Sequence, residues 1–370
     1  MTRGGYMYET TLEVLKKIES HGFKVYAVGG YVRDLYLKRK TFDVDICTNA
    51  TPKELKEIFK DVMLPKTQYG SITVIYNKIR FEITTFRKEY KYEKNRLPVK
   101  IKYINDLVKD LKRRDFIINT LCMDSEGNII DVFDSRKDLD NKIIKAVGNP
   151  RHKLKEDALR ILRAIRFATI LDFKLDEPLK KYIKKYGYLL KKLSYQRKKD
   201  ELDKIFSSPN VRYGLSLIKE LGLDKHLELS NIDSVVVTSS MLGIWAQVDV
   251  ENIYKFNKNE LETIRKIKEL LPKDILDEIN LYKYGLYITT IVGEIKNIDR
   301  KLITKKYNEF AIKNHKDIVI NGEQICNLLR KKPGPYVKKI LNDIENKILK
   351  KELVNEKNAL KKYIIDNYNN

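Results

Sequence analysis

The chain has few of the residues that would cross-link it or bind zinc. Among its 370 residues are only three cysteines, four histidines and nine prolines. The cysteines (Cys47, Cys122 and Cys326) are widely separated and odd in number, which excludes a disulfide framework and a zinc-ligand spacing. None of the histidines is followed by aspartate, so a metal-dependent phosphohydrolase of the His-Asp type is excluded as well.

Long apolar segments are also missing. No run of residues could span a bilayer, and no signal peptide is recognisable. We therefore expect a cytoplasmic protein without a membrane partner. With 370 residues, the chain is long enough to form two or more domains with a sizeable core.

Positive charge, in contrast, is in excess. Lysine and arginine total 74 against 51 aspartates and glutamates, which gives a formal net charge of +23. Part of this excess is typical of AT-rich genomes, which also enrich tyrosine, and the chain has 23 tyrosines. The remainder still favours a polyanionic partner.

The most informative stretch begins with a strand pattern over Phe23–Val28, rich in β-branched and aromatic residues. Gly29 and Gly30 interrupt it, and Tyr31–Leu37 is predicted to form a short helix. The turn and the helix N-terminus after it offer backbone N–H groups that could bind phosphate. A Gly-Gly pair alone is usually just a turn.

A second strand is predicted over Phe42–Cys47, and it carries Asp43 and Asp45. Residues two apart on a strand point to the same face, so the two carboxylates should project together. Such a pair is costly unless a cation lies between the charges, and oxygen ligands suit Mg²⁺, which usually takes one or two carboxylates plus substrate phosphates. Together with the glycine turn, the pair indicates a metal-dependent site that acts on a nucleoside triphosphate.

The residues G-G-Y-V-R-D followed by F-D-V-D resemble the signature of the nucleotidyltransferase superfamily, specifically the second class of tRNA nucleotidyltransferases (CCA-adding enzymes), which is related to bacterial poly(A) polymerases. The resemblance implies that Asp43 and Asp45 bind Mg²⁺ and that Gly29, Gly30 and Arg33 bind the nucleotide. The segment F-E-I-T-T-F-R is similar to the one that carries the family's third carboxylate, which makes Glu82 a catalytic candidate. From the residues alone, Glu82 is an exposed strand glutamate.

Further segments extend the resemblance. Arg87–Pro98 is charged and aperiodic and is predicted to be a mobile loop, at the position where the family has a flexible loop needed for the final A. K-R-R-D-F-I-I-N is similar to a family motif linked to ribose recognition, which implicates Arg114. Asp131–Leu139 resembles the hinge motif but has Asp134 and Ser135 where a glycine pair is typical.

A helix is predicted over Lys155–Leu171. At about 100° per residue, its polar half carries one aspartate and three arginines, namely Asp157, Arg160, Arg163 and Arg166. An ordinary amphipathic helix with a solvated basic face would look the same. A functional alternative is that Asp157 accepts a hydrogen bond from the exocyclic amine of cytosine or adenine, while Arg160 donates a hydrogen bond to the adjacent ring nitrogen.

The family pattern E-D-x-x-R agrees with the second alternative, because it is the protein template for CTP and ATP. Arg163 and Arg166 would then face the triphosphate or the RNA 3′ end. Ser194–Phe206 resembles the segment that supports this helix, and Ile320–Pro335 resembles a tail that holds the tRNA elbow, although a plain helical linker is the alternative there.

The resemblance implies an α+β fold, with an N-terminal polymerase-β-like mixed sheet followed by an all-α neck, body and tail. We expect a catalytic head over residues 1–145, a nucleotide-selecting neck over 146–206, and a tRNA-binding body and tail over 207–370. The predicted function is template-independent addition of C, C and A to the 3′ end of tRNA from CTP and ATP. One alternative is an enzyme that adds only C-C or only A, and another is a poly(A) polymerase. Poly(A) polymerases usually carry an Arg-rich run after the D-x-D strand, and this chain lacks such a run, which disfavours poly(A) synthesis.

Overall fold

The computed structural model describes residues 3–60, 70–92 and 98–369. The chain forms two compact units, Met1–Leu229 and Ser230–Asn370. The first unit carries the sheet and the candidate site, and the second is helical. The prediction of an N-terminal mixed sheet followed by helices is therefore confirmed.

The central sheet of the first unit has six strands in the order β3-β4-β2-β1-β7-β8. Its strands are β1 (Val25–Val28), β2 (Val44–Thr48), β3 (Ser71–Tyr76), β4 (Ile79–Thr85), β7 (Cys122–Met123) and β8 (Ile129–Ile130). The pair β2–β4 is parallel and the other neighbours are antiparallel, which makes the sheet mixed. The register places Asp45 of β2 opposite Glu82 of β4.

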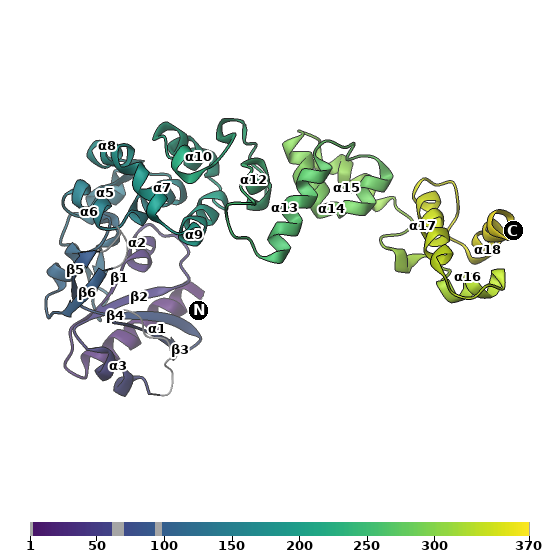
Figure 1. Ribbon diagram of the computed structural model, residues 1–370. Helices are drawn as coiled ribbons and strands as arrows, with labels where there is room; N and C mark the ends of the chain where they lie inside the picture. Colours follow the sequence, from purple (N-terminus) through teal and green to yellow (C-terminus); the bar gives the residue numbers. More distant parts are fainter. Residues whose placement is uncertain (1–2, 61–69, 93–97, 370) are drawn as a thin grey trace. The chain divides into compact units, whose positions relative to one another are not determined.

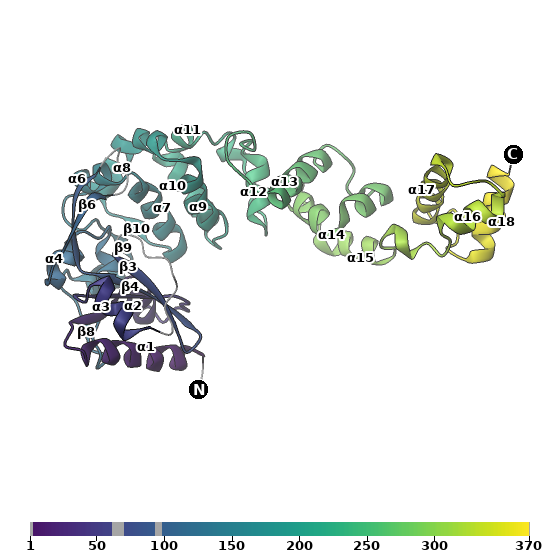
Figure 2. The same ribbon diagram turned by 60° about the horizontal axis from the view of Figure 1, so that its bottom comes forward.

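Helices α1 (Arg3–Glu19) and α3 (Pro52–Ile58) lie beside each other against this sheet (Figures 1 and 2). Helix α3 begins at a capping box that Thr51 and Glu54 form. A tight turn at Asn77 and Lys78, both with positive φ, connects the antiparallel strands β3 and β4.

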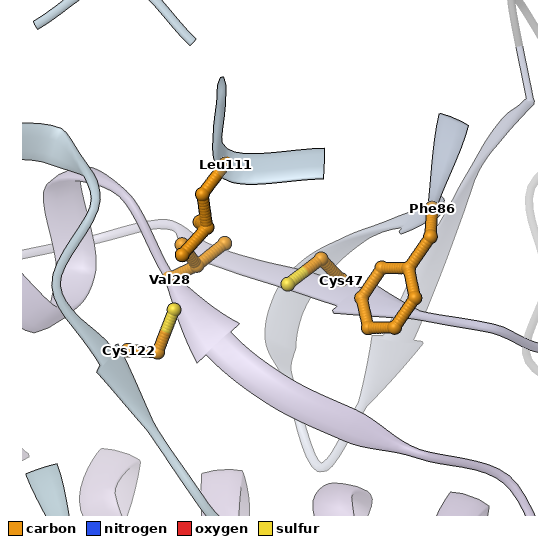
Figure 3. Close-up of a cluster of buried hydrophobic side chains, with 5 residues drawn as sticks. All are labelled: Val28, Cys47, Phe86, Leu111 and Cys122. Carbon is orange, nitrogen blue, oxygen red and sulfur yellow. The ribbon is translucent and has the colours of Figure 1, made fainter. Parts of the chain in front are cut away.

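A small apolar cluster supports the end of β1 next to the glycine turn. Val28, Cys47, Phe86, Leu111 and Cys122 are completely buried there (Figure 3). Two of the chain's three cysteines thus serve as small core residues, and all three are free thiols. The cluster joins β1 and β2 to α4 (Leu107–Lys112), and so fixes the strand ends that lead into the site.

The prediction of a loop over Arg87–Pro98 is wrong for its described residues. Arg87–Tyr92 forms strand β5, which pairs antiparallel with β6 (Pro98–Tyr103); residues 93–97 lie outside the described part of the chain. Among the described side chains of β5, those that face inward are Arg87 and Glu89, which form an ion pair at 2.8 Å. Because these two inner positions carry charges instead of apolar residues, the usual alternation of a strand is hidden.

The predicted helix over Lys155–Leu171 is interrupted. Helix α6 (Pro150–Glu156) ends before Asp157, whose backbone is extended (φ −139°, ψ 108°), and α7 (Leu159–Leu171) starts after it. The carboxylate of Asp157 accepts a hydrogen bond from the N–H of Leu159 at 2.9 Å. Aspartate favours helix N-termini for this reason, so the wheel that placed Asp157 and the arginines on one helix is wrong at Asp157.

The remaining elements complete the two units. In the first unit these are α2 (Gly30–Tyr36), α5 (Ser135–Asp140), β9 (Ile143–Ile144), β10 (Lys174–Leu175), α8 (Glu177–Tyr186), α9 (Tyr195–Phe206), α10 (Val211–Glu220), α11 (Asp224–Leu227) and the 3₁₀ turns Ile117–Asn119 and Gly187–Lys192. In the second unit these are α12 (Met241–Gln247), α13 (Lys258–Leu270), α14 (Glu278–Ile295), α15 (Arg300–Asn308), α16 (Gly322–Leu329), α17 (Pro335–Leu349), α18 (Lys357–Tyr368) and the 3₁₀ turns Ile232–Ser234 and His315–Asp317. Across the described ranges, no helix has the length and apolarity that a membrane span requires.

At the segment that resembles the hinge motif, Asp134 has a φ of 56°. This left-handed conformation favours glycine, and aspartate is one of the few other residues that tolerate it. The side chain of Asp131 accepts hydrogen bonds from the N–H groups of Ser135 and Arg136 at 2.7 and 3.0 Å, which holds the start of α5. The departure from the glycine pair therefore keeps the backbone shape that glycine would allow.

Candidate active site

The glycine turn connects β1 to α2 and lies directly against a carboxylate. Gly29 has a φ of 73°, and a Cβ atom there would come within 3.0 Å of Oδ2 of Asp45. Only glycine can adopt this positive φ and also leave room for the Asp45 carboxylate without strain. Gly30 has no such restriction, since a Cβ atom there would meet Arg33 at an ordinary 3.6 Å.

Arg33 is held on the first turns of α2 by two polar side chains. It is 6% exposed, and its Nε donates to Asp34 at 2.9 Å while Nη1 donates to Asn119 at 2.8 Å. A guanidinium fixed in this way loses little entropy on binding a phosphate oxygen. The position agrees with a phosphate-binding role.

The three predicted carboxylates gather where the start of β2 pairs with the middle of β4. Asp43 is exposed and precedes β2, which starts at Val44 instead of Phe42; Asp45 lies within the strand and Glu82 is its partner in the register. Burial raises the pKa of Asp45, Arg114 opposes this, and the negative charges of Glu82 and Asp43 raise it further. A cation placed among these groups would relieve the repulsion.

This donor set fits a magnesium ion that also binds substrate phosphates. Carboxylate oxygens are the hard ligands that Mg²⁺ prefers, and one or two of them usually suffice when phosphates supply others. Within the described residues, no group of three or more His, Cys, Asp or Glu side chains could hold a metal ion by itself. A metal ion held by Asp43 and Asp45 would therefore need further ligands, such as the phosphate oxygens of a bound nucleotide.

Two adjacent arginines follow α4 and are fixed by a buried carboxylate. Asp110 is completely buried; its Oδ1 accepts from Nε of Arg113 at 2.9 Å and from the N–H of Arg87 at 3.0 Å. Its Oδ2 lies 3.5 Å from Nη2 of Arg114. Arg114 in turn approaches the glycine turn, with Nη1 3.8 Å from the Cβ position of Gly29.

The three arginines of α7 each have a partner. Arg163 donates to Asp115 at 2.6 Å, and Arg166 forms an ion pair with Glu201 at 3.2 Å. Nη1 of Arg160 donates to the carbonyl of Lys153 at 2.8 Å and to Glu156 at 2.7 Å, and its Nη2 donates to the carbonyl of Arg113 at 3.2 Å. Ion pairs with partly buried carboxylates keep these guanidinium groups charged and oriented.

The ion pairs shift the pKa values of Asp115 and Arg166 in ways that keep both groups charged. Burial alone would raise the pKa of Asp115, but Arg163 together with Asn119 and Arg160 holds it well below its usual range. Burial lowers the pKa of Arg166 to about 10, and Glu201 limits the decrease. Both groups are therefore ionised at neutral pH.

A cavity of about 540 Å³ brings most of the predicted residues together. Its lining includes the predicted residues Gly29, Gly30, Arg33, Asp45, Arg114, Asp157, Arg160, Arg163 and Arg166. Asp43 and Glu82 are not among the lining residues; they adjoin the cavity through their electrostatic contact with Asp45. The volume is in the range of small-molecule sites.

The same cavity contains residues that we did not predict. They are Glu89, Arg113, Asp115, Asn119, Leu159, Phe167 and Arg197. Asp115 and Asn119 belong to the R-R-D-F-I-I-N segment, so the sequence could have indicated them. Phe167 carries no such signal, because a phenylalanine in an amphipathic helix is typical of the core. Its ring nevertheless contacts the guanidinium groups of Arg33, Arg163 and Arg166, whose central carbons lie 5.1, 5.4 and 4.4 Å from the ring centroid.

Comparison with known proteins first identifies the class of the fold. Residues 25–145 match the family model described as the poly A polymerase head domain. Further models, for an RNA-binding region of polymerase A and for a second domain of tRNA nucleotidyltransferases, match residues 172–231 and 246–364. The first unit thus has a nucleotidyltransferase head, in agreement with its mixed sheet and carboxylates.

Whole-length relatives then identify the family. The chain is 37% identical to the CCA-adding enzyme of Lactococcus lactis subsp. cremoris, over 94% of this chain and 93% of the relative. It is 32% identical to the CCA-adding enzyme of Streptococcus uberis, over 98% of both chains. It also resembles the crystal structure of the Bacillus stearothermophilus CCA-adding enzyme in complex with CTP, with a TM-score of 0.85, 26% identity and coverage of 97% of both chains. The chain belongs to the CCA-adding enzyme family.

Proposed function

We propose that this protein adds C, C and A to the 3′ end of tRNA without a nucleic-acid template, from CTP and ATP and with release of pyrophosphate. The observation that carries the proposal is the single cavity in which Asp45 and the glycine turn meet Asp157 and the arginines of α7. One side of this cavity can hold the triphosphate and the other can read a base. The family membership supports the same activity.

CCA-adding enzymes are nucleotidyltransferases, which generally use a divalent metal ion, and we propose Mg²⁺ here with Asp43 and Asp45 as its ligands. The bound ion would lower the pKa of the tRNA 3′-hydroxyl and neutralise charge on the triphosphate. Glu82 faces Asp45 across the parallel strands and would complete the negative site. Gly29, Gly30 and Arg33 would bind the phosphates from the opposite side, through N–H groups and the fixed guanidinium.

Base selection is proposed for the other side of the cavity. Asp157 would accept from the exocyclic amine that cytosine and adenine share, and Arg160 would donate to the ring nitrogen beside it. Nη1 and Nη2 of Arg160 have protein partners in the structure, so a base would have to replace one of those contacts. Arg114 would contact the ribose, and Arg163 and Arg166 would face the triphosphate or the RNA 3′ end.

We further propose that residues 1–145 act as the catalytic head, 146–206 as the nucleotide-selecting neck, and 207–370 as the tRNA-binding body and tail, and that the protein works in the cytoplasm. The net charge of +23 supports a large polyanionic partner such as tRNA. Residues 93–97, within the segment linked to the final A, lie outside the described part of the chain.

The test is incorporation on a tRNA transcript that lacks its 3′ C-C-A, with CTP, ATP or both, resolved to single nucleotides. We expect three additions that require both nucleotides and then stop. Two additions from CTP with no A from ATP would make the protein a C-C-adding enzyme. A long adenylate ladder would indicate poly(A) synthesis instead.

A further inference from the structure

A second cavity adjoins the nucleotide cavity and is lined mainly by lysines. It has a volume of about 350 Å³, and Lys88, Lys109, Lys112 and Lys153 line it together with Arg113. These residues come from β5, α4 and α6 or lie directly after α4, so the first unit alone forms this lysine cavity. None of the five is among the residues that the sequence predicts for the site.

The lysine cavity shares part of its wall with the nucleotide cavity, because Glu89 and Arg113 line both. Arg160, which lines the nucleotide cavity, donates to the backbone carbonyl groups of Lys153 at 2.8 Å and of Arg113 at 3.2 Å. It thus holds two residues of the lysine cavity in place from the side of the nucleotide. The lysine cavity is therefore the adjacent space for an anion that leaves the nucleotide cavity.

Lys153 is buried in this wall without a carboxylate partner. The residue is only 9% exposed, and its Nζ donates to the backbone carbonyl of Lys112 at 2.6 Å. An ammonium group can donate three hydrogen bonds, and no second acceptor for this one occurs in the described part of the chain. A buried cation without a counter-ion is costly, which indicates that an anion binds there.

The two glutamates of the lysine cavity do not supply that counter-ion. Glu89 accepts from Nε of Arg87 at 2.8 Å and lies 3.4 Å from Nη1 of Arg113. Glu156 accepts from Nη1 of Arg160 at 2.7 Å. Guanidinium groups thus balance both carboxylates, and the lysines leave the cavity with an excess of positive charge.

The other three lysines are exposed and can turn toward a ligand. Lys88 lies over the ring of Tyr90, with Nζ 5.1 Å from the ring centroid, and Lys109 forms an ion pair with Asp106 at 3.2 Å. Solvent screens both contacts, so they are weak. Because an ammonium group on a flexible four-carbon chain reorients easily, these lysines can add contacts to an anion bound at Lys153.

The pKa of Lys153 reflects the missing counter-ion. Burial lowers this pKa to about 8, the charge of Arg160 lowers it as well, and the charge of Glu156 opposes the decrease. A bound anion would favour the charged form of the ammonium group.

We propose that the lysine cavity binds inorganic pyrophosphate after it has left the nucleotide cavity. Pyrophosphate carries its negative charges on two adjacent phosphate groups, so the buried ammonium and the exposed lysines can bind it together. The cavity is large enough for a small molecule of this kind. This site rests on the proposed function and deepens it, because pyrophosphate is the product that the proposed reaction releases.

The proposal has a consequence for binding. A nucleotide in its own cavity and pyrophosphate in the lysine cavity should be bound at the same time. If pyrophosphate bound only where the terminal phosphates of the nucleotide bind, each would exclude the other.

The experiment measures the binding of radiolabelled pyrophosphate by equilibrium dialysis. The protein is first saturated with the α,β-methylene analogue of CTP, which occupies the nucleotide cavity and is not cleaved. We expect one pyrophosphate to bind to each wild-type chain. In Lys153→Met the affinity should fall at least about tenfold, because the charge-assisted hydrogen bonds of the buried ammonium are lost.

Two further variants make the result specific. Lys112→Met removes an exposed charge of the lysine cavity without disturbing buried packing, and should weaken pyrophosphate binding by about threefold. Lys137→Met is the matched control, since it removes an exposed lysine of α5 that lines neither cavity. It should bind pyrophosphate as wild type does. Thermal melts show whether each variant is folded, and Lys112→Met decides the question if Lys153→Met is not.

Three results would overturn the proposal. The first is that wild type binds no pyrophosphate while the analogue is bound, and the second is that both cavity variants bind it as tightly as wild type. The third is that tRNA without its C-C-A displaces the labelled pyrophosphate, because the lysines would then bind an RNA backbone. Absence of C-C-A addition by wild type would instead refute the proposed function, whereas the dialysis involves no catalysis and tests the pyrophosphate site separately.

Discussion

At the scale of single residues, the site consists of charges that are almost all matched. Arg33, Arg163 and Arg166 each contact a carboxylate within the first unit, and all three guanidinium groups adjoin the ring of Phe167. Such pairs contribute less to stability than their short distances suggest, because burying two charges is costly. Their effect is to fix several positive groups in a cavity before a polyanionic substrate arrives.

The first prediction at this scale concerns Asp43. Asp43→Ala should reduce nucleotide incorporation at least about 1,000-fold, or ~4 kcal/mol in the barrier, because a proposed metal ligand is lost. Binding of tRNA should be nearly unchanged, because the residue is a single exposed side chain. Single-turnover incorporation and a filter-binding assay measure the two quantities.

Glu57→Ala is the matched control for Asp43, since it removes an exposed carboxylate from α3, away from the cavity. It should retain wild-type incorporation. Retained activity of the Asp43 variant would show that the metal assignment is wrong.

The second prediction concerns Asp115, whose pKa is depressed in the folded protein despite its burial. Asp115→Asn should destabilise the first unit by about 2 kcal/mol at pH 7, because the charge-assisted bond to Arg163 is lost. A depressed carboxyl pKa stabilises the fold above the unfolded value of about 3.9 and loses that contribution as the pH falls through the folded value. The difference from wild type should therefore be constant near neutrality and shrink in acid.

Urea unfolding at several pH values measures this difference. The control is Asp200→Asn, at an exposed position on α9 that contacts Gln196. It should change stability by less than about 0.5 kcal/mol. A difference for Asp115→Asn that grows in acid would contradict the assignment.

At the scale of elements, the connection from β1 to α2 decides how close the backbone can approach the carboxylates. Its two glycines look alike in sequence but differ in conformation. Gly29 has positive φ and faces Oδ2 of Asp45 at 3.0 Å from its Cβ position, whereas Gly30 belongs to the helix and has room for a methyl group. The pair therefore offers a comparison within one turn.

We predict that Gly29→Ala lowers kcat/KM for CTP at least about 100-fold, whereas Gly30→Ala lowers it by less than about tenfold. A methyl group at position 29 must strain the backbone by about 1–2 kcal/mol and also displace Asp45. At position 30 the added atom makes an ordinary contact with Arg33. Steady-state kinetics with thermal melts test the pair, and equal losses would refute the geometric distinction.

Two elements also show where patterns in the sequence mislead. Strand β5 was hidden because its inward side chains, Arg87 and Glu89, are charged and paired instead of apolar. The break before α7 was hidden because a helical wheel assumes continuous helix, while Asp157 uses its own side chain to cap the next helix. In both cases a polar contact replaced the apolar signal on which prediction depends.

At the scale of the whole molecule, the charge is spread over a long chain with a net value of +23. Binding of a polyanion to such a protein releases counterions and so weakens with salt. We predict that tRNA affinity falls at least about tenfold between about 50 and 200 mM KCl. Fluorescence anisotropy with labelled tRNA measures this.

The apparent affinity for CTP is the internal reference for the salt experiment. It should change much less, because a nucleotide makes contacts with few charged groups at one cavity, whereas tRNA displaces counterions along its backbone. A tRNA affinity that is insensitive to salt would contradict a binding surface dominated by the phosphate backbone.

The sequence by itself determined the class of fold, the glycine turn and the carboxylates, because these depend on local order: a strand pattern, two glycines, and aspartates two residues apart. It also placed Asp157, Arg160, Arg163 and Arg166 together, although they are divided between a helix break and α7. Only the tertiary structure brought Asp110 to Arg113 and Arg114, Phe167 beneath three guanidinium groups, and Arg197 to Asp157. These contacts join charged or aromatic residues on different elements, and no periodicity along the chain marks which of many such residues will meet.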